Sequence, residues 1–247
     1  MIRMLLQSAV LAGMVLILAL PALRSSQRGW IAGAGALAFL YSIAIFIPIA
    51  FPHLLPVLGK EWNWTGKLVS IATTTVMTIV LLAFAGFRAR DLGLTFAQAP
   101  GTGRAMLFGV IPFLMLVGYL VWQMSPHNPW PGRETLAYQA SLPGLDEEFF
   151  FRGVLLAIFD RMFPAKRTVL GARMGYGALA ISIVFGVGHA VLLDKALHPH
   201  FFIAEGIFAG IIGLMLVWIR ARTQSLVLPV LTHNAVNLIN YIIPAVF

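Results

Sequence analysis

The chain contains no cysteine and few charged residues. Without cysteine it forms no disulfide, holds no metal through thiolates and has no cysteine nucleophile. Charged residues make up 11% of its 247 residues, whereas a soluble domain carries roughly a quarter. So little polar surface excludes an ordinary soluble domain, because such a domain must face water on all sides.

Hydrophobic residues are abundant instead: they make up 60% of the chain and recur in long runs. About 20 apolar residues suffice for a helix to cross a bilayer. We therefore predict an all-α, polytopic membrane protein of about eight transmembrane helices, folded as a single transmembrane domain over residues 1–247. The predicted spans are 4–23, 30–51, 68–87, 104–124, 144–163, 175–193, 201–219 and 226–246.

The basic residues give a formal net charge of +8 and stand singly or in small groups between the apolar runs. This distribution is typical of topology signals, so we predict the lipid bilayer and no nucleic acid as a partner. The odd-numbered loops hold eleven of them: Arg24, Arg28, Arg88, Arg90, Arg104, Arg161, Lys166, Arg167, Arg173, Arg220 and Arg222. The other side holds five: Arg3, Lys60, Lys67, Arg133 and Lys195. We expect the odd-numbered loops in the cytoplasm and both termini outside, in the cell membrane.

Three predicted spans carry polar side chains, which are costly in a bilayer and usually mark function. The first set is Asp146-Glu147-Glu148, followed by Arg152. Glu148 and Arg152 stand at i and i+4 with the acid first, the favourable order for an ion pair. We therefore expect Arg152 to neutralise Glu148, leaving Glu147 available for proton transfer. Alternatively, the three acids only complement a helix N-terminus, which leaves the arginine unexplained.

The other two sets contain histidines. His189 follows Phe185 by one helical turn, deep in the predicted sixth span, and His233 and Asn237 share one face of the last span. Each alone is also explained as a packed or hydrogen-bonded side chain. Together with Glu147 they make a fuller set. A carboxylate and a histidine can activate water, and a histidine and an asparagine can donate to an oxyanion. Those are the parts of a hydrolase whose site lies inside the bilayer.

The three sets also carry a resemblance to a known family. They appear in order as Glu147-Glu148-x-x-x-Arg152, Phe185-x-x-x-His189 and His233-x-x-x-Asn237. This pattern resembles the CPBP family, the CAAX-protease and bacteriocin-processing enzymes related to type II CAAX prenyl endopeptidases. The resemblance covers roughly residues 90–240.

The resemblance implies an intramembrane endopeptidase acting on a membrane-associated or exported protein or peptide. By position, it implies that Glu147, assisted by His189, activates water and that His233 and Asn237 stabilise the oxyanion. Two further classes stay open: a proton-coupled transporter that uses the same groups as a relay, and a non-catalytic membrane scaffold or immunity protein. A transporter commonly shows duplicated halves, and the sequence has no such symmetry.

The resemblance gives Glu148 and Arg152 supporting roles and leaves metal dependence open. Glu147, His189 and His233 would be the ligands of a catalytic zinc, with water in the fourth position. We favour the metal-free, glutamate-type site and expect no cofactor. The two histidines lie on different spans, without the single-helix pair of the H-E-x-x-H proteases, and the asparagine beside the second one is a good oxyanion donor.

Overall fold

The computed structural model describes residues 1–55, 58–194 and 196–247. Its α-helices are α1 (Ile2–Ala19), α2 (Trp30–Ala50), α3 (Trp64–Phe84), α4 (Thr102–Ala105), α5 (Ile111–Met124), α6 (Arg133–Gln139), α7 (Leu142–Glu148), α8 (Leu156–Met162), α9 (Tyr176–Ala190), α10 (Ile203–Thr223) and α11 (Val227–Val246). A 3₁₀ segment, η1 (Leu20–Arg24), and two π-helical segments, η2 (Met106–Val110) and η3 (Phe149–Leu155), continue these helices. The strands are β1 (Arg167–Val169), β2 (Ala172–Met174), β3 (Val191–Leu193) and β4 (Pro199–Phe201).

Each of the eight predicted spans coincides with a helix or an unbroken helical run. The fourth span is the run from α4 through η2 to α5, and the fifth is the run from α7 through η3 to α8. The all-α, polytopic prediction is therefore confirmed. The helical bounds differ from the predicted ones by a few residues, and the largest consequence falls on α3, which begins at Trp64 rather than at 68.

Five helical stretches among the described residues are long and apolar enough to cross a membrane: Ile2–Arg24, Trp30–Ala50, Trp64–Phe84, Thr102–Met124 and Ile203–Thr223. The other three predicted spans are the ones that carry the motifs. The α7–α8 run contains four charged residues between Asp146 and Arg152, α9 has only 15 residues, and α11 contains His233 and three asparagines. Polar side chains of the candidate site thus lower the hydropathy of the α7–α8 run and of α11, whereas α9 is apolar but short.

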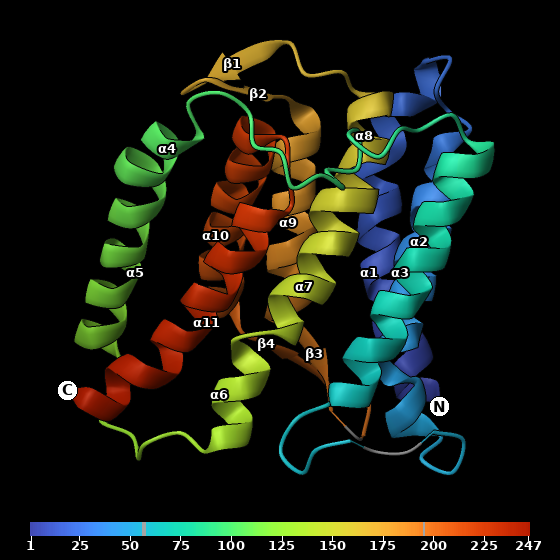
Figure 1. Ribbon diagram of the computed structural model, residues 1–247. Helices are drawn as coiled ribbons and strands as arrows, with labels where there is room; N and C mark the ends of the chain where they lie inside the picture. The colour runs from blue at the N-terminus through green and yellow to red at the C-terminus, as the bar shows by residue number, and fades with distance from the viewer. Residues whose placement is uncertain (56–57, 195) are drawn as a thin grey trace.

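The helices run up and down in a bundle, with α11 inclined to the others (Figure 1). All odd-numbered loops lie at one end of the bundle and both termini lie at the other (Figure 1). This arrangement agrees with the alternation assumed in counting the basic residues, and the cytoplasmic placement of the odd-numbered end stays a prediction. Lys67, counted as a loop charge, lies in the first turn of α3 and is buried. Arg220 and Arg222, also counted with a loop, lie in the last turn of α10, and Arg220 is buried as well. Lys195 lies outside the described residues.

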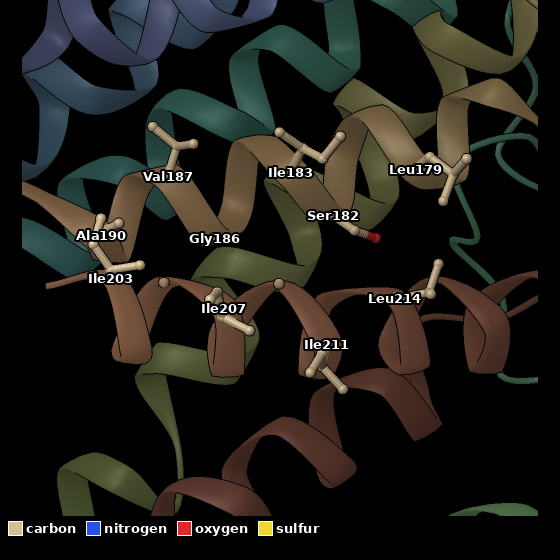
Figure 2. Close-up of a pocket in the computed structure, with 12 residues that line it drawn as sticks. Leu179, Ser182, Ile183, Gly186, Val187, Ala190, Ile203, Ile207, Ile211 and Leu214 are labelled. Atoms are coloured by element: carbon tan, nitrogen blue, oxygen red, sulfur yellow. The ribbon is translucent and has the colours of Figure 1, made fainter.

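Helices α9 and α10 pack closely beside the site and meet through glycines. A Cβ at Gly186 would lie 2.6 Å from the carbonyl oxygen of Gly206, so neither helix accepts a larger residue there without moving. An apolar groove of about 430 Å³ follows this contact and is lined by aliphatic side chains such as Ile183, Ile207 and Ile211 (Figure 2). The close approach fixes the height of α9, and with it that of His189, against the rest of the bundle.

Three small elements were not predicted from the sequence: helix α6 and the antiparallel hairpins β1–β2 and β3–β4. The second hairpin directly follows α9 and is tied to α1 by one side chain. The amide of Gln7 donates to the carbonyl oxygen of Val191 over 2.7 Å and accepts from the N–H of Leu193 over 3.1 Å. A further hydrogen bond, between Ser8 and Ser42, joins α1 to α2. The first helix is therefore an integral part of the bundle.

Helix α7 begins inside the bundle, and its first turn is fixed by α11. Pro143 stands at the start, where its missing N–H and fixed φ suit a helix N-terminus. The next N–H, that of Gly144, donates to Asn234 Oδ1 over 2.8 Å, and Asn234 Nδ2 donates to the carbonyl oxygen of Ser141. Since buried backbone groups require partners, Asn234 satisfies the two that α7 exposes to α11.

Candidate active site

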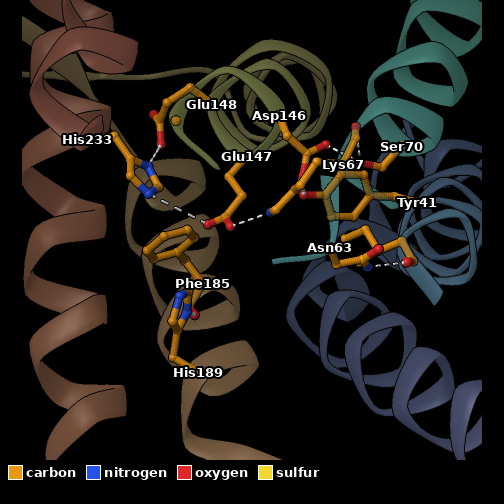
Figure 3. A network of polar contacts seen from close by, with 12 residues as sticks. Tyr41, Asn63, Lys67, Ser70, Asp146, Glu147, Glu148, Phe185, His189 and His233 are labelled. Atoms are coloured by element: carbon orange, nitrogen blue, oxygen red, sulfur yellow. Dashed lines mark hydrogen bonds and ion pairs between the residues drawn. The ribbon is translucent and has the colours of Figure 1, made fainter. Parts of the chain in front are cut away.

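Glu147 lies in α7 between His233 of α11 and Lys67 of α3 (Figure 3). Its Oε1 accepts a hydrogen bond from Lys67 Nζ over 2.7 Å. Its Oε2 is buried, has no hydrogen-bond partner among the described residues, and lies 3.9 Å from His233 Nε2. That separation is too long for a direct hydrogen bond, and it suits two atoms that share one water molecule. The two oxygens of Glu147 therefore have different surroundings.

The predicted ion pair between Glu148 and Arg152 is present: Arg152 Nη1 lies 2.9 Å from Glu148 Oε1, and both side chains are fully buried. The same oxygen also contacts His233 Nδ1 at 2.8 Å. Arg152 is held further by a hydrogen bond from Nη2 to the carbonyl oxygen of Gly213 and by the ring of Phe185, whose centroid lies 4.3 Å from its guanidinium carbon. The pair thus orients His233, so that Nε2 is the nitrogen that faces Glu147.

Asp146, the first acid of the motif region, is fully buried and is used for packing helices together. It accepts hydrogen bonds from Tyr41 of α2 over 3.0 Å, from Lys67 of α3 over 2.8 Å, and from Ser70 of α3. These contacts do not involve a helix N-terminus, because three side chains from two other helices surround the carboxylate. The alternative reading of the acids as mere helix-end charges therefore does not account for Asp146.

His189 shares a cavity with Glu147 but does not touch it. Both line a cavity of about 200 Å³ between α1, α2, α7 and α9. His189 Nδ1 contacts the carbonyl oxygen of Phe185 on its own helix at 2.8 Å, and Figure 3 shows its ring beyond Phe185, away from His233. The expectation that His189 lies deep in its span is wrong, because α9 ends at Ala190, one residue later.

Asn237 stands one turn beyond His233 on α11 and is partly buried. The pattern placed both on one face, and the helix that contains them is continuous, as predicted. The sequence analysis did not single out Asn234, which holds the first turn of α7 through its side-chain amide.

Lys67, Tyr41 and Ser70 were also missed as neighbours of the site. A signal for Lys67 was present: Asn63 caps α3 by accepting from the N–H of Gly66 over 2.9 Å, and a cap there places Lys67 inside the helix. Nothing in the sequence pairs it with acids about 80 residues away.

No group of three or more potential metal ligands lies close together among the described residues. Of the three residues considered for zinc, His189 and His233 each use Nδ1 in another contact, and only Glu147 and His233 approach each other.

In the sixth loop, the carboxylate of Asp194 contacts His198 and His200 beside the β3–β4 hairpin. Hydrogen bonds from the backbone N–H of His198 and from the ring of His200 hold the pKa of Asp194 below its ordinary value. These contacts indicate a structural role for Asp194 in the hairpin.

The site thus consists of a buried glutamate and a histidine oriented by a second carboxylate, within a bundle of membrane-length helices. Residues 134–239 match the family model described as Type II CAAX prenyl endopeptidase Rce1-like. The match supports a membrane protease of the CAAX type in general. The matched segment runs from α6 to α11 and contains the three motifs, whereas Tyr41, Lys67 and Ser70 lie before it. No curated protein and no solved structure gives a significant match.

Proposed function

We propose that the chain hydrolyses a peptide bond of a membrane-associated or exported protein or peptide, with Glu147 as the base that activates water. The observation that carries this proposal is the buried Glu147 Oε2, which has no hydrogen-bond partner in the part of the chain that the structure describes and lies 3.9 Å from His233 Nε2. A buried carboxylate oxygen without a partner is rare in folded proteins and requires an explanation. A water molecule bound between these two atoms would contact the carboxylate of Glu147 on one side and the imidazole of His233 on the other.

The reaction follows from this placement. The water oxygen bonds to the carbonyl carbon of the substrate, and one of its protons passes to Glu147 Oε2. The tetrahedral intermediate carries its negative charge on the former carbonyl oxygen, for which His233 and Asn237 are the candidate donors. The proton on Glu147 then passes to the leaving nitrogen as the C–N bond breaks, which returns the carboxylate to its starting state. His189 assists from the other side of the shared cavity.

The role of Glu148 and Arg152 in this scheme is support. Glu148 accepts from His233 Nδ1, and this contact fixes the orientation of the ring before Nε2 interacts with the oxyanion. Preorganised donors stabilise a developing charge without reorganising during the reaction. We propose a glutamate-type mechanism that needs no cofactor.

The test is Glu147→Gln in the full chain, purified and reconstituted into liposomes. Wild-type protein and variant are incubated with lipidated peptides and with single-span membrane peptides, and new termini are identified by mass spectrometry. Glutamine keeps the hydrogen bond from Lys67 but cannot take up a proton, so we expect cleavage to fall below detection with folding unchanged. Glu205→Gln, at an exposed glutamate in α10, is the matched control and should cleave normally. Cleavage by Glu147→Gln at the wild-type rate would refute the assignment, and failure of the wild type to cleave any peptide would favour the non-catalytic scaffold.

A further inference from the structure

Lys67 is a buried lysine that the motifs do not include, and its ammonium group contacts two carboxylates. Nζ lies 2.7 Å from Glu147 Oε1 and 2.8 Å from Asp146 Oδ2, and the side chain is 11% exposed. It comes from α3, which precedes the segment matched by the family model. A charge buried at this depth is costly unless it is paired, so these two contacts explain why a lysine is tolerated in the membrane-spanning helix.

The two contacts of Lys67 differ in what surrounds them. Asp146 is fully buried and also accepts from Tyr41 and Ser70, so its carboxylate is fixed by three side chains. Asp146 in turn fixes the ammonium group. Among the described residues, Lys67 is the one hydrogen-bond donor to Glu147, whose other oxygen has no partner. The Asp146 carboxylate, held by three side chains, thus anchors the lysine, and the lysine holds the Glu147 carboxylate.

We propose that Lys67 is a positioning residue for Glu147: it binds Oε1 and thereby turns Oε2 toward His233. This inference rests on the proposed function, in which Oε2 takes the proton from water. The glutamate side chain has three rotatable bonds, and without a donor at Oε1 nothing among the described residues holds the carboxylate plane. The ammonium group also keeps the carboxylate ionised, which is the form that a base requires. On this view the N-terminal helices complete a site whose motifs lie in the C-terminal half.

The competing explanation is that Lys67 only neutralises charge and stabilises the fold. A single Lys67→Met variant would not decide between them, because it leaves two buried carboxylates unpaired and would unfold. The comparison is therefore made in an Asp146→Asn background. Asparagine still accepts from Tyr41 and Lys67 with its oxygen. Its amide can donate to Ser70, whose hydroxyl has a second acceptor 3.0 Å away in the carbonyl oxygen of Lys67.

The decisive pair is Asp146→Asn against Lys67→Met/Asp146→Asn. The double variant carries the same net charge at the site as the wild type, because one cation and one anion are removed together. It differs from the single variant by the ammonium group of Lys67, so its kcat is compared with the wild type, at equal net charge, as well as with Asp146→Asn. We expect kcat to fall by about 100-fold between the two, the loss typical of a reacting group displaced by about 1 Å, with KM changed by less than about twofold. Lys67→Arg/Asp146→Asn should recover part of kcat, since it restores a cationic donor.

A second measurement needs no substrate. Dicyclohexylcarbodiimide modifies uncharged carboxyl groups inside membranes, and the modified residue is identified by mass spectrometry of peptides from the labelled protein. We expect Glu147 to be protected in Asp146→Asn and to be modified in Lys67→Met/Asp146→Asn. Ser70→Ala, which removes a contact to Asp146 and none to Glu147, is the matched control and should leave Glu147 protected.

The outcomes separate the two proposals. If Glu147→Gln still cleaves peptides, the proposed function is wrong regardless of Lys67. If Glu147→Gln is inactive but the double variant matches Asp146→Asn in kcat and in labelling, Lys67 is a structural residue and the positioning role is refuted. Equal labelling of Glu147 in both variants overturns the positioning role even where no substrate is cleaved, and a double variant more active than its parent does the same.

Discussion

Replacing Arg152 with alanine removes the cation that neutralises a fully buried carboxylate. Glu148 Oε1 would keep only its contact with His233 Nδ1, and Glu148 Oε2 has no hydrogen-bond partner among the described residues even with the arginine in place. Breaking a buried pair by removing one partner costs roughly 3–5 kcal/mol, because it leaves a charge uncompensated. Folded proteins are stable by only about 5–15 kcal/mol, so Arg152→Ala should lower the folded yield in detergent sharply.

The second mutation of the cycle separates charge from packing. Glu148→Ala/Arg152→Ala removes the charge but leaves His233 Nδ1 without an acceptor, a loss of about 1–3 kcal/mol. Glu148→Gln/Arg152→Ala removes the charge and retains that acceptor. We therefore expect stability to rise in the order Arg152→Ala, then the double variant with alanine, then the double variant with glutamine. Arg161→Ala is the control, because Arg161 donates its hydrogen bonds to the backbone carbonyls of residues 85 and 86. Its loss therefore leaves no buried carboxylate without a cation.

Unfolding of each variant is followed by tryptophan fluorescence during titration with a denaturing detergent, with monodispersity by size-exclusion chromatography as a second readout. The coupling energy between positions 148 and 152 comes from the double-mutant cycle. Finding the double alanine variant less stable than either single variant would refute the reasoning, because it would mean that the charge of Glu148 is stabilised without Arg152.

Three further predictions concern topology, metal and backbone packing. Lys166→Cys in this cysteine-free chain should not react with an impermeant maleimide added outside intact cells; labelling from outside would reverse the orientation. Peptide cleavage should survive exhaustive dialysis against a strong chelator, whereas activity lost on zinc removal and regained on its return would establish a metalloprotease. Gly144→Ala should lower stability by about 1–3 kcal/mol, because its Cβ would meet Asn234 and lie 2.8 Å from the carbonyl oxygen of Val230; an unchanged unfolding midpoint would show that α7 and α11 can separate at no cost.

The spans were predictable because hydrophobic runs of membrane length are a local property of the sequence. The ion pair between Glu148 and Arg152 was predictable for the same reason, since one helix places i and i+4 together. The β3–β4 hairpin was not, because three-residue strands in a polar loop carry too short a pattern to detect. That hairpin also ends α9 at Ala190 and moves His189 from the predicted interior of its span to its edge.

Contacts between helices were beyond the sequence. Asp146, Glu147 and Glu148 are three similar acids in a row, yet their surroundings differ. Asp146 contacts α2 and α3, Glu147 contacts Lys67 of α3 and lines the cavity, and Glu148 contacts His233 of α11. Successive residues on a helix point about 100° apart, so the divergence follows from helical geometry, but the identity of each partner depends on how the bundle packs. Lys67 in particular was counted as a loop charge because its span was begun one turn too late.

The hydrogen bonds of Gln7 with the first strand of the β3–β4 hairpin bear on how far the chain can be shortened. A fragment limited to residues 134–239 would retain every motif yet lose the side chain that holds the strand following His189, along with the ammonium group beside Glu147. The Asp146 and Glu147 carboxylates and the N–H of Leu193 would then lose these hydrogen bonds. We therefore expect the matched segment to fold less stably alone than within the full chain, and a minimal enzyme built on this chain should keep α1 from residue 7 onward.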